Sequence, residues 1–388
     1  MNNFSHIAAG LRLFCGSDSL KSLPAELARV KSSRAVVFCG KTVAASPELL
    51  GAVRNILGER CSAVFAGVRA HSPVDTVKAG ADLLRESRAD AVIAIGGGSA
   101  IVTARAATIL ACEKDELREL CSHRDSEGRF LSPKLRAPKL PQFVVPTSPT
   151  TAMVKAGSGV FDSQSGSRLT MFDPKTRAQA VFLHPVFALS APKQLAVAAS
   201  LNALAMSVEG IESETSNPLS DGMLMHSLRL LARNLFPLIE AGESADVRME
   251  LMMAAILCGQ GTDHASPGIA SALGHALGLR LRIDNGLANG ILLPHTMRFN
   301  APVTGARREK VAEALGRPSD NNDAEAAIRA VKELVASLQV PKRLRDAGVP
   351  HEALLGVAET AMDDWFLHQN PRPINGVESV MTILDAAW

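Results

Sequence analysis

The stretch "AVIAIGGGSAIVTARAATILA", residues 91–111, decides the fold class. Apolar strand formers end in Gly96, Gly97, Gly98 and Ser99, and a helical pattern follows them. Glycines in a strand-to-helix turn let backbone N–H groups and the positive end of the helix approach a pyrophosphate, because no Cβ intervenes. We therefore predict phosphate binding by these four residues. A turn built for packing alone is the alternative, and the pattern differs from the G-x-G-x-x-G dinucleotide fingerprint.

Short apolar runs alternate with helical patterns through the first half of the chain. They are "RAVVFCG" (34–40), "SAVFAGV" (62–68) and "QFVVPTS" (142–148), beside the run already quoted. This alternation predicts a parallel sheet with helices on both faces. Ser-Gly turn signals within residues 157–174 predict a hairpin, and "AQAVFLHP" (178–185) predicts one more strand.

The second half of the chain follows a helical pattern. Runs such as "APKQLAVAASLNALAMSVEGIES" (191–213) and "ADVRMELMMAAILCGQGTD" (245–263) carry apolar residues at helical spacing and few strand formers. A chain of 388 residues also exceeds one typical hydrophobic core. We predict an α/β nucleotide-binding domain over residues 1–187 and an all-α substrate and catalytic domain over residues 188–388.

The composition argues against several classes of protein. The formal net charge is +2, which offers no excess of positive charge for a nucleic-acid backbone. The six cysteines form no C-x-x-C pair, which argues against a zinc knuckle or a disulfide framework. No leader pattern is evident, and no apolar run approaches the roughly 18 residues that span a bilayer. We expect a cytoplasmic protein that binds neither nucleic acid nor membranes.

Hydroxyl groups follow the strand at 142–148 and are candidates to contact a coenzyme. In "VVPTSPTTAM" (144–153), the hydroxyls of Thr147, Ser148, Thr150 and Thr151 are candidates to line a ribose or nicotinamide. Ordinary turn residues are the alternative, since Ser and Thr are common after strands. The chain contains no tyrosine, so a proton donor must be His, Lys, Cys, a carboxylic acid, a hydroxyl or water.

Two pairs of polar or soft side chains are spaced four residues apart in the helical half. Asn202 and Met206 form one pair, Ser271 and His275 the other, so each pair shares one helix face. An isolated Met206 is more typical of a core. The glycines beside His275 in "ALGHALG" either open space around the ring or serve close helix packing.

Together these motifs resemble the iron-containing, or group III, alcohol dehydrogenase family. The resemblance covers nearly the whole chain. It rests on "LFCGSDSLKSL" (13–23), "IGGGS" (95–99), "PTS" (146–148), "LNALAMSVEGIES" (201–213), "GHALG" (274–278), "NGLANGILLPHTMRFN" (285–300) and "NPRPINGVESVMTILDAAW" (370–388). It implies a dehydroquinate synthase-like fold, an NAD(P) coenzyme and hydride transfer between an alcohol and a carbonyl.

The chain departs from the family at its metal site. The family's ligands, one Asp and three His, fall by position on Asn202, Met206, Ser271 and Asn285. Two amides, a thioether and a hydroxyl leave a divalent charge uncompensated, so the resemblance predicts a site without metal. We assign these four residues to substrate binding. His275 falls on the family's other active-site histidine, which is linked to proton relay, and we assign it as the general acid.

These departures define the expected function. Asn at the first ligand position also occurs in the maleylacetate reductase branch, which works without an obligatory metal. We expect a homodimeric, metal-independent reductase that uses NADPH or NADH on a small activated carbonyl or enone, such as an oxo acid of the maleylacetate type. A lyase or isomerase, and a nucleotide-binding protein without chemistry, are the alternatives.

Coenzyme choice depends on the end of the second strand. Gly40 stands where NAD-preferring relatives often carry an Asp, and Lys41 follows it. A missing acid beside a cation tolerates a 2′-phosphate, so we expect NADPH to be accepted.

Overall fold

The structure of the chain is a computed structural model, and it describes residues 3–8, 10–127, 130–240, 244–317 and 325–388. Two compact units divide the chain. One ends at Ala191, and the other begins at Pro192 and includes the N-terminal segment up to Ala8. The domain limits predicted from the sequence, 1–187 and 188–388, refer to domains that fold independently. They stay a prediction.

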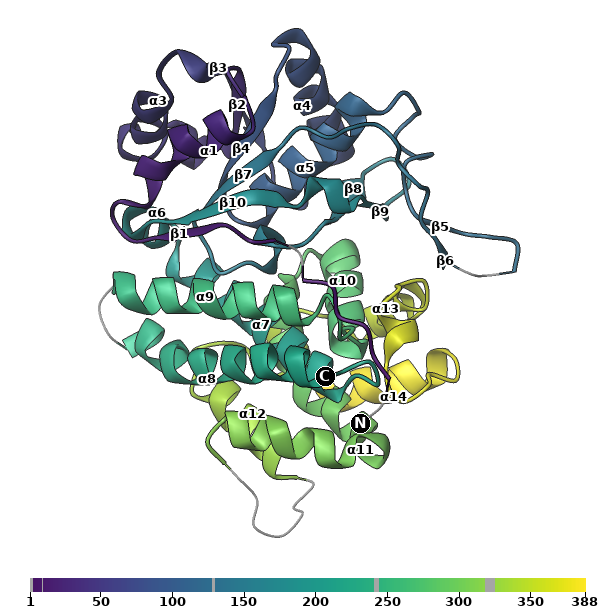
Figure 1. Ribbon diagram of the computed structural model, residues 1–388. Coiled ribbons are helices and arrows are strands. Elements are labelled where there is room, and N and C mark those ends of the chain that lie inside the picture. The colour runs from purple at the N-terminus through teal and green to yellow at the C-terminus, as the bar shows by residue number, and fades with distance from the viewer. Residues whose placement is uncertain (1–2, 9, 128–129, 241–243, 318–324) are drawn as a thin grey trace. The chain divides into compact units, whose positions relative to one another are not determined.

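A six-stranded sheet forms the centre of the first unit (Figure 1). Its order is β1-β10-β7-β4-β2-β3, and every pairing between neighbours is parallel, as the apolar runs predicted. Three residues give no periodicity, so the short edge strand β1 was not predicted. The strands are β1 (Leu13–Cys15), β2 (Ala35–Gly40), β3 (Cys61–Val68), β4 (Ala91–Gly96), β7 (Gln142–Pro146) and β10 (Ala178–Leu183).

Helices cover both faces of this sheet. They are α1 (Leu23–Arg29), α2 (Lys41–Ala44), α3 (Ala52–Leu57), α4 (Val74–Glu86), α5 (Gly98–Cys112) and α6 (Pro185–Leu189). Short helical turns lie at η1 (Ser19–Ser22), η2 (Pro47–Gly51), η3 (Gly58–Arg60), η4 (Thr151–Met153) and η5 (Pro174–Thr176).

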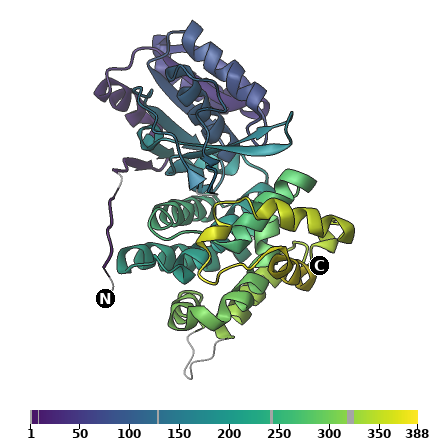
Figure 2. The same ribbon diagram turned by 90° about the vertical axis from the view of Figure 1, so that its right-hand side faces the viewer.

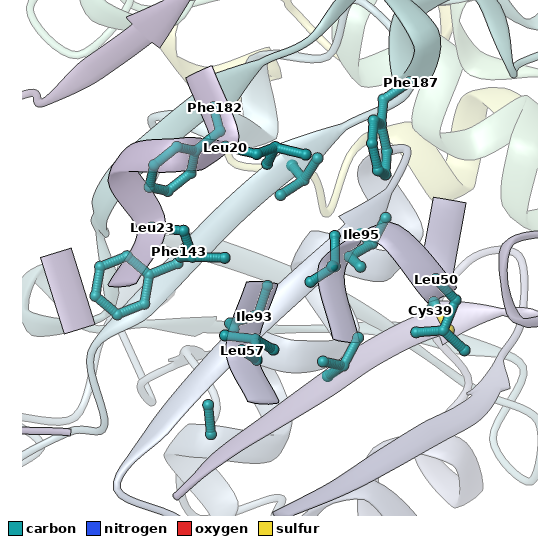
Figure 3. Packing of buried hydrophobic residues seen from close by; sticks show 14 of the residues in the cluster. Leu20, Leu23, Cys39, Leu50, Leu57, Ile93, Ile95, Phe143, Phe182 and Phe187 are labelled. Carbon is teal, nitrogen blue, oxygen red and sulfur yellow. The ribbon is translucent and has the colours of Figure 1, made fainter. Parts of the chain in front are cut away.

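The alternation of side chains along each strand supplies a core on each face. On one face, Cys39, Ile93 and Phe143 pack with Leu23 and Leu57 in a single buried cluster (Figure 3). On the other face, Phe38 lies against α4 and α5. A Cβ on Gly80 of α4 would stand 2.7 Å from the Phe38 ring and 3.2 Å from Ala107 Cβ. Both faces are therefore tightly covered, which explains the continuous apolar strands.

The predicted hairpin within 157–174 is confirmed. Strands β8 (Gly157–Asp162) and β9 (Ser167–Phe172) pair in antiparallel register around a turn at Gly166, whose φ is +63°. A second small antiparallel pair joins β5 (His123–Arg124) to β6 (Phe130–Leu131).

The second unit is helical, as its sequence pattern predicted. It contains α7 (Lys193–Glu212), α8 (Pro218–Glu240), α9 (Ala245–Gly261), α10 (Ile269–Leu281), α11 (Asn285–Ala314), α12 (Ala326–Ala336), α13 (Leu354–Ala361) and α14 (Val377–Ala387). Short turns lie at η6 (Arg345–Ala347), η7 (His351–Ala353) and η8 (Leu367–Gln369). Helix α11 kinks at Gly305, where φ is 21° and ψ is −115°.

Helix α7 lies at the centre of this unit. It packs against α8, α9, α10 and α11, while α13 and α14 lie beside α10 and α11 (Figure 2). A Cβ on Gly286 would come within 1.7 Å of the Ala198 carbonyl oxygen, so α11 starts with its backbone against α7. By length and hydropathy α7 alone in the described ranges resembles a membrane span, but most of its apolar window is buried inside the unit.

Candidate functional site

The predicted coenzyme residues gather at one edge of the parallel sheet. Strands β7, β4 and β2 are neighbours in that order, and the register pairs Gly96 with Pro146 and Cys39 with Ile95. Gly40 and Gly96 are the last residues of β2 and β4, and Thr147 directly follows β7. The loops after these strands therefore leave the sheet side by side. The carboxyl edge of a parallel α/β sheet is where such folds bind ligands.

Backbone geometry explains why the turn after β4 consists of glycines. Gly96 has a φ of +143°, which side-chain-bearing residues rarely adopt. Gly97 caps α5, and a Cβ there would stand 3.0 Å from Ser148 Oγ. A Cβ on Gly98 would stand 3.1 Å from Thr150 Oγ1. The glycine turn and the hydroxyl loop after β7 thus touch directly, and the Thr147 N–H donates to the Gly96 carbonyl at 3.1 Å.

The two loops differ in exposure. In the glycine turn and at the end of β2, the half-buried residues are Gly40, Gly97, Gly98 and Ser99, and Lys41 is exposed. After β7, by contrast, Thr147 and Thr151 are buried, with exposed fractions of 6% and 9%. The half-buried glycine backbone can be approached from solvent. The two threonines are largely covered.

Arg105 of α5 holds the hydroxyl loop in place, and the sequence did not single it out. Its fully buried guanidinium donates to the carbonyls of Ala152 at 2.6 Å and Gly157 at 2.7 Å. Burial, together with the smaller effect of the nearby Arg177 charge, lowers the pKa of Arg105 to about 9. On the opposite side, Ser72 Oγ donates to the Ser99 carbonyl at 3.2 Å.

In the helical unit, Asn202 and Met206 meet as their spacing predicted. Asn202 Nδ2 donates to Met206 Sδ at 3.3 Å, and Asn289 Nδ2 of α11 donates to Asn202 Oδ1 at 3.0 Å. In its other amide orientation, Asn289 donates to the carbonyls of Ala270 at 2.7 Å and Asn285 at 3.0 Å. Asn289 therefore joins α11 to a neighbouring helix in either orientation, a role that the sequence pattern did not indicate.

Ser271 belongs to a different contact. Its Oγ donates to Glu209 Oε2 at 2.5 Å, and its backbone N–H donates to Glu209 Oε1 at 3.2 Å. Burial raises the pKa of Glu209, while hydrogen bonds from Ser271, Gly268 and Ala270 lower it. The carboxyl group of Glu209 thus caps the first turn of α10. The Ser271 hydroxyl is engaged in that cap and is 2% exposed.

His275 lies against a carboxylate. Its Nδ1 lies 2.8 Å from Asp364 Oδ2, and the two side chains are 16% and 14% exposed. The Phe366 ring packs against the imidazole, with centroids 5.4 Å apart. This arrangement holds one ring nitrogen in a fixed contact with an acid.

The glycines on either side of His275 serve helix packing, which was one of the two open interpretations. A Cβ on Gly274 would stand 1.9 Å from Asn289 Oδ1, and one on Gly278 would stand 2.2 Å from Asn285 Oδ1. Both glycines therefore make room for asparagines of α11. Asn285 is half-buried and begins that helix.

A buried carboxyl group lies on the same helix as Asn202. Glu212 is 1% exposed, and its Oε2 accepts a hydrogen bond from Asn300 Nδ2 at 3.2 Å. Its Oε1 has no hydrogen-bond partner among the described residues. Burial raises the pKa of Glu212 to about 8, although Asn300 and Arg308 oppose the shift. Asn300 also exchanges hydrogen bonds with Asn370.

The partners that sequence patterns did not indicate lie far along the chain from the residues they contact. Asn289 is 87 residues from Asn202, Glu209 is 62 from Ser271, and Asp364 is 89 from His275. No spacing rule links residues so far apart, because only the packing of different helices joins them. Within the described ranges, no group of three or more His, Cys, Asp or Glu side chains is arranged to hold a metal ion.

Comparison with known proteins gives one consistent result. The family model described as iron-containing alcohol dehydrogenase matches residues 11–185. The model of the C-terminal part of the Fe-containing alcohol dehydrogenase family matches residues 196–388. The two matches together cover both units.

Individual relatives agree with these models. Lactaldehyde reductase of Escherichia coli (strain K12) is 30% identical over 331 residues, 84% of each chain. Maleylacetate reductase of Sphingobium indicum is 30% identical over 377 residues, 97% of this chain and 95% of that protein. An alcohol dehydrogenase from Oenococcus oeni has the same fold, with a TM-score of 0.91 at 22% identity and complete coverage of both chains.

Proposed function

The chain belongs to the iron-containing alcohol dehydrogenase family, and we propose that it is a metal-independent reductase of a small activated carbonyl or enone. The family comprises NAD(P)-dependent alcohol and aldehyde dehydrogenases and maleylacetate reductases, so the chain is an oxidoreductase. Metal independence, substrate class and coenzyme preference are the proposed parts.

The side chains at the four positions of the family's metal ligands support metal independence. They are Asn202, Met206, Ser271 and Asn285. None of them offers a carboxylate or an imidazole, which are the ligands that iron and zinc prefer beside thiolate. The Asn202 side chain donates a hydrogen bond to Met206 and accepts one from Asn289, and the Ser271 hydroxyl donates to Glu209. These residues do not fit a divalent cation, and no step of the proposed reaction uses one.

Loss of a Lewis acid restricts the substrate. A metal ion contributes several kcal/mol by polarising a carbonyl oxygen. Without that contribution the carbonyl must be electron-poor by itself, as in an oxo acid, an enone or a reactive aldehyde. An oxo acid of the maleylacetate type is our first candidate, because a maleylacetate reductase resembles this chain over 97% of its length.

The α/β unit supplies the coenzyme-binding part of the proposal. Gly97, Gly98 and Ser99 present a half-buried backbone at the start of α5, directly after buried Gly96, a geometry that suits a pyrophosphate. Thr147 and Thr151 follow the adjacent strand, where we assign them to the nucleoside part. Exposed Lys41 and the absence of an acid at Gly40 favour acceptance of NADPH. The bound coenzyme supplies the hydride.

The observation that carries the proposal is the contact between His275 and Asp364. His275 lies on α10, the helix that also bears Ser271. A carbonyl that accepts a hydride needs a proton on its oxygen, and histidine titrates near neutral pH. We assign that proton to His275, and we assign the half-buried amides Asn202 and Asn285 to the substrate. Met206 and Ser271 are buried, so their proposed part is to shape the wall behind those amides.

A screen for coenzyme oxidation tests the proposal. The purified protein, without added metal, is mixed with NADPH or NADH and with maleylacetate, lactaldehyde or a 2-oxo acid. We expect loss of the reduced-nicotinamide absorbance with at least one activated carbonyl, and much slower reaction with an unactivated ketone such as acetone. Oxidation of neither coenzyme by any activated carbonyl would contradict the proposal.

The same screen separates the alternative functions. A lyase or isomerase would consume a substrate in the absence of any coenzyme, which mass spectrometry of the reaction mixture detects. A homodimer and a cytoplasmic location are also proposed, and light scattering of the purified protein checks the first.

A further inference from the structure

Asp364 is held in place by two contacts, one on each carboxylate oxygen. Oδ1 accepts the backbone N–H of Phe366 at 2.9 Å, and Oδ2 lies 2.8 Å from His275 Nδ1. The Asp364 N–H itself donates to the carbonyl of Ala361, the last residue of α13. The carboxylate is therefore fixed by its own backbone turn, and the imidazole meets an acceptor whose position is already set.

The surroundings hold the ring at this acceptor. Helix α10, which carries His275, packs against α13 and against η8, the turn that follows Phe366. The Phe366 ring lies beside the imidazole at an interplanar angle of 35°. Aromatic packing and one charge-assisted hydrogen bond together leave the ring few alternative orientations.

We propose that Asp364 is the positioning residue that fixes the tautomer of His275, so that Nδ1 carries a proton toward Asp364 and Nε2 exchanges the proton with the substrate. This inference rests on the proposed function, in which His275 is the proton donor. It names a residue that neither the sequence spacing nor the family match had assigned.

The proton balance of the step follows from this arrangement. The hydride adds to the carbonyl carbon, and the π electrons of the C=O bond move to oxygen. That oxygen takes the proton from Nε2, and the coenzyme leaves oxidised. His275 remains as the neutral ring with its Nδ1–H still donated to Asp364, and solvent restores the proton. In the reverse direction the same nitrogen accepts the alcohol proton.

Asp364→Asn reverses the tautomer without removing the turn. The amide oxygen must stay with the Phe366 N–H, because the NH2 group there would face a donor. The NH2 group then faces His275 Nδ1, which must act as an acceptor, so the neutral ring carries its proton on Nε2. Asp363→Asn is the matched control, since Asp363 is the preceding residue and its side chain is exposed.

Nitrogen-15 NMR of the coenzyme-free protein reads the tautomer directly, at a pH where the ring is neutral. The His275 signals are identified by their absence from the His275→Ala spectrum. We expect protonated Nδ1 in the parent and in Asp363→Asn, and protonated Nε2 in Asp364→Asn. Asp364→Ser, whose hydroxyl can accept from the Phe366 N–H but is too short to reach the ring, should give a mixture. An unchanged Nδ1–H signal in Asp364→Asn overturns the proposal.

Turnover of the best substrate from the screen completes the test. We expect Asp364→Asn to lose at least about tenfold in kcat, with coenzyme affinity unchanged. The loss should not exceed the roughly 10²- to 10⁴-fold that general acid catalysis supplies. The double variant with His275→Ala should be no slower than His275→Ala alone, because both changes remove one function. Full activity of Asp364→Asn, or additive losses, overturns the role of Asp364. Full activity of His275→Ala overturns the proposed function itself.

Discussion

The glycine turn of the α/β unit and the His275 region of the helical unit are built in different ways. The turn is contiguous and presents backbone N–H groups, with Gly96 at a φ of +143°. The His275 region assembles side chains from α7, α10, α11 and the segment after α13. A backbone site persists as long as its glycines do. A side-chain site changes its chemistry when a few residues change.

Replacing His275 should have the largest effect. We expect His275→Ala to lower kcat by about 10²- to 10⁴-fold, because the proton donor is lost. Coenzyme affinity, measured by calorimetry, should stay as in the parent, since we assign coenzyme binding to the other unit. His226→Ala, at an exposed position of α8, is the matched control. Equal losses in turnover and coenzyme affinity would break the division between the two regions.

A charge in the glycine turn should have the converse effect. We expect Gly98→Asp to weaken coenzyme binding by at least about tenfold, because a carboxylate would oppose the phosphates at the start of α5. Gly98→Ala adds the Cβ that would stand 3.1 Å from Thr150 Oγ1 but no charge, so it isolates the steric part. Undiminished calorimetric affinity in Gly98→Asp would place the pyrophosphate elsewhere.

The helical unit should also respond to pH through Glu212. Burial raises its pKa from 4.5 to about 8 in the folded chain. Between these values the folded chain keeps a proton that the unfolded chain has released, so rising pH favours unfolding. We expect the Tm of the parent to fall from about pH 5 to about pH 8 by more than that of Glu212→Gln, which has no such proton. Parallel Tm curves for the two proteins would show that Glu212 does not titrate as described.

The smallest expected effect is at Lys41. An exposed cation contributes on the order of 0.2–1 kcal/mol to a charge contact, which corresponds to about a 1.4- to fivefold change in affinity. Lys41→Ala should weaken NADPH binding by that factor and leave NADH binding unchanged. A loss shared equally by both coenzymes would show that Lys41 does not contact the 2′-phosphate.

Local patterns predicted the parallel sheet well. The parallel strands, the β8–β9 hairpin and the helical second half follow from runs of fewer than twenty-five residues, because strand and helix periodicity are local properties. The glycine turn was recognised for the same reason. Its support by Arg105 was not, since a buried arginine within α5 gives no signal that distinguishes it from an exposed one.

The His275 region was predicted only in part. Spacing of four residues placed Asn202 beside Met206, and their contact is present. The same rule placed Ser271 and His275 on one helix face but gave no partner for either; Ser271 contacts Glu209 and His275 contacts Asp364. Those partners come from other helices, and only tertiary packing decides which side chain of a helix face meets which neighbour.

The central claim is a reductase that works without a divalent metal, and one measurement tests it most directly. The metal content of the purified protein is determined by mass spectrometry, and coenzyme oxidation with the best substrate is followed before and after exhaustive chelation. We predict no stoichiometric iron or zinc and an unchanged rate, because Asn202, Met206, Ser271 and Asn285 supply neither charge nor imidazole. One metal ion per chain, with activity lost on chelation and restored by that metal, would contradict the account.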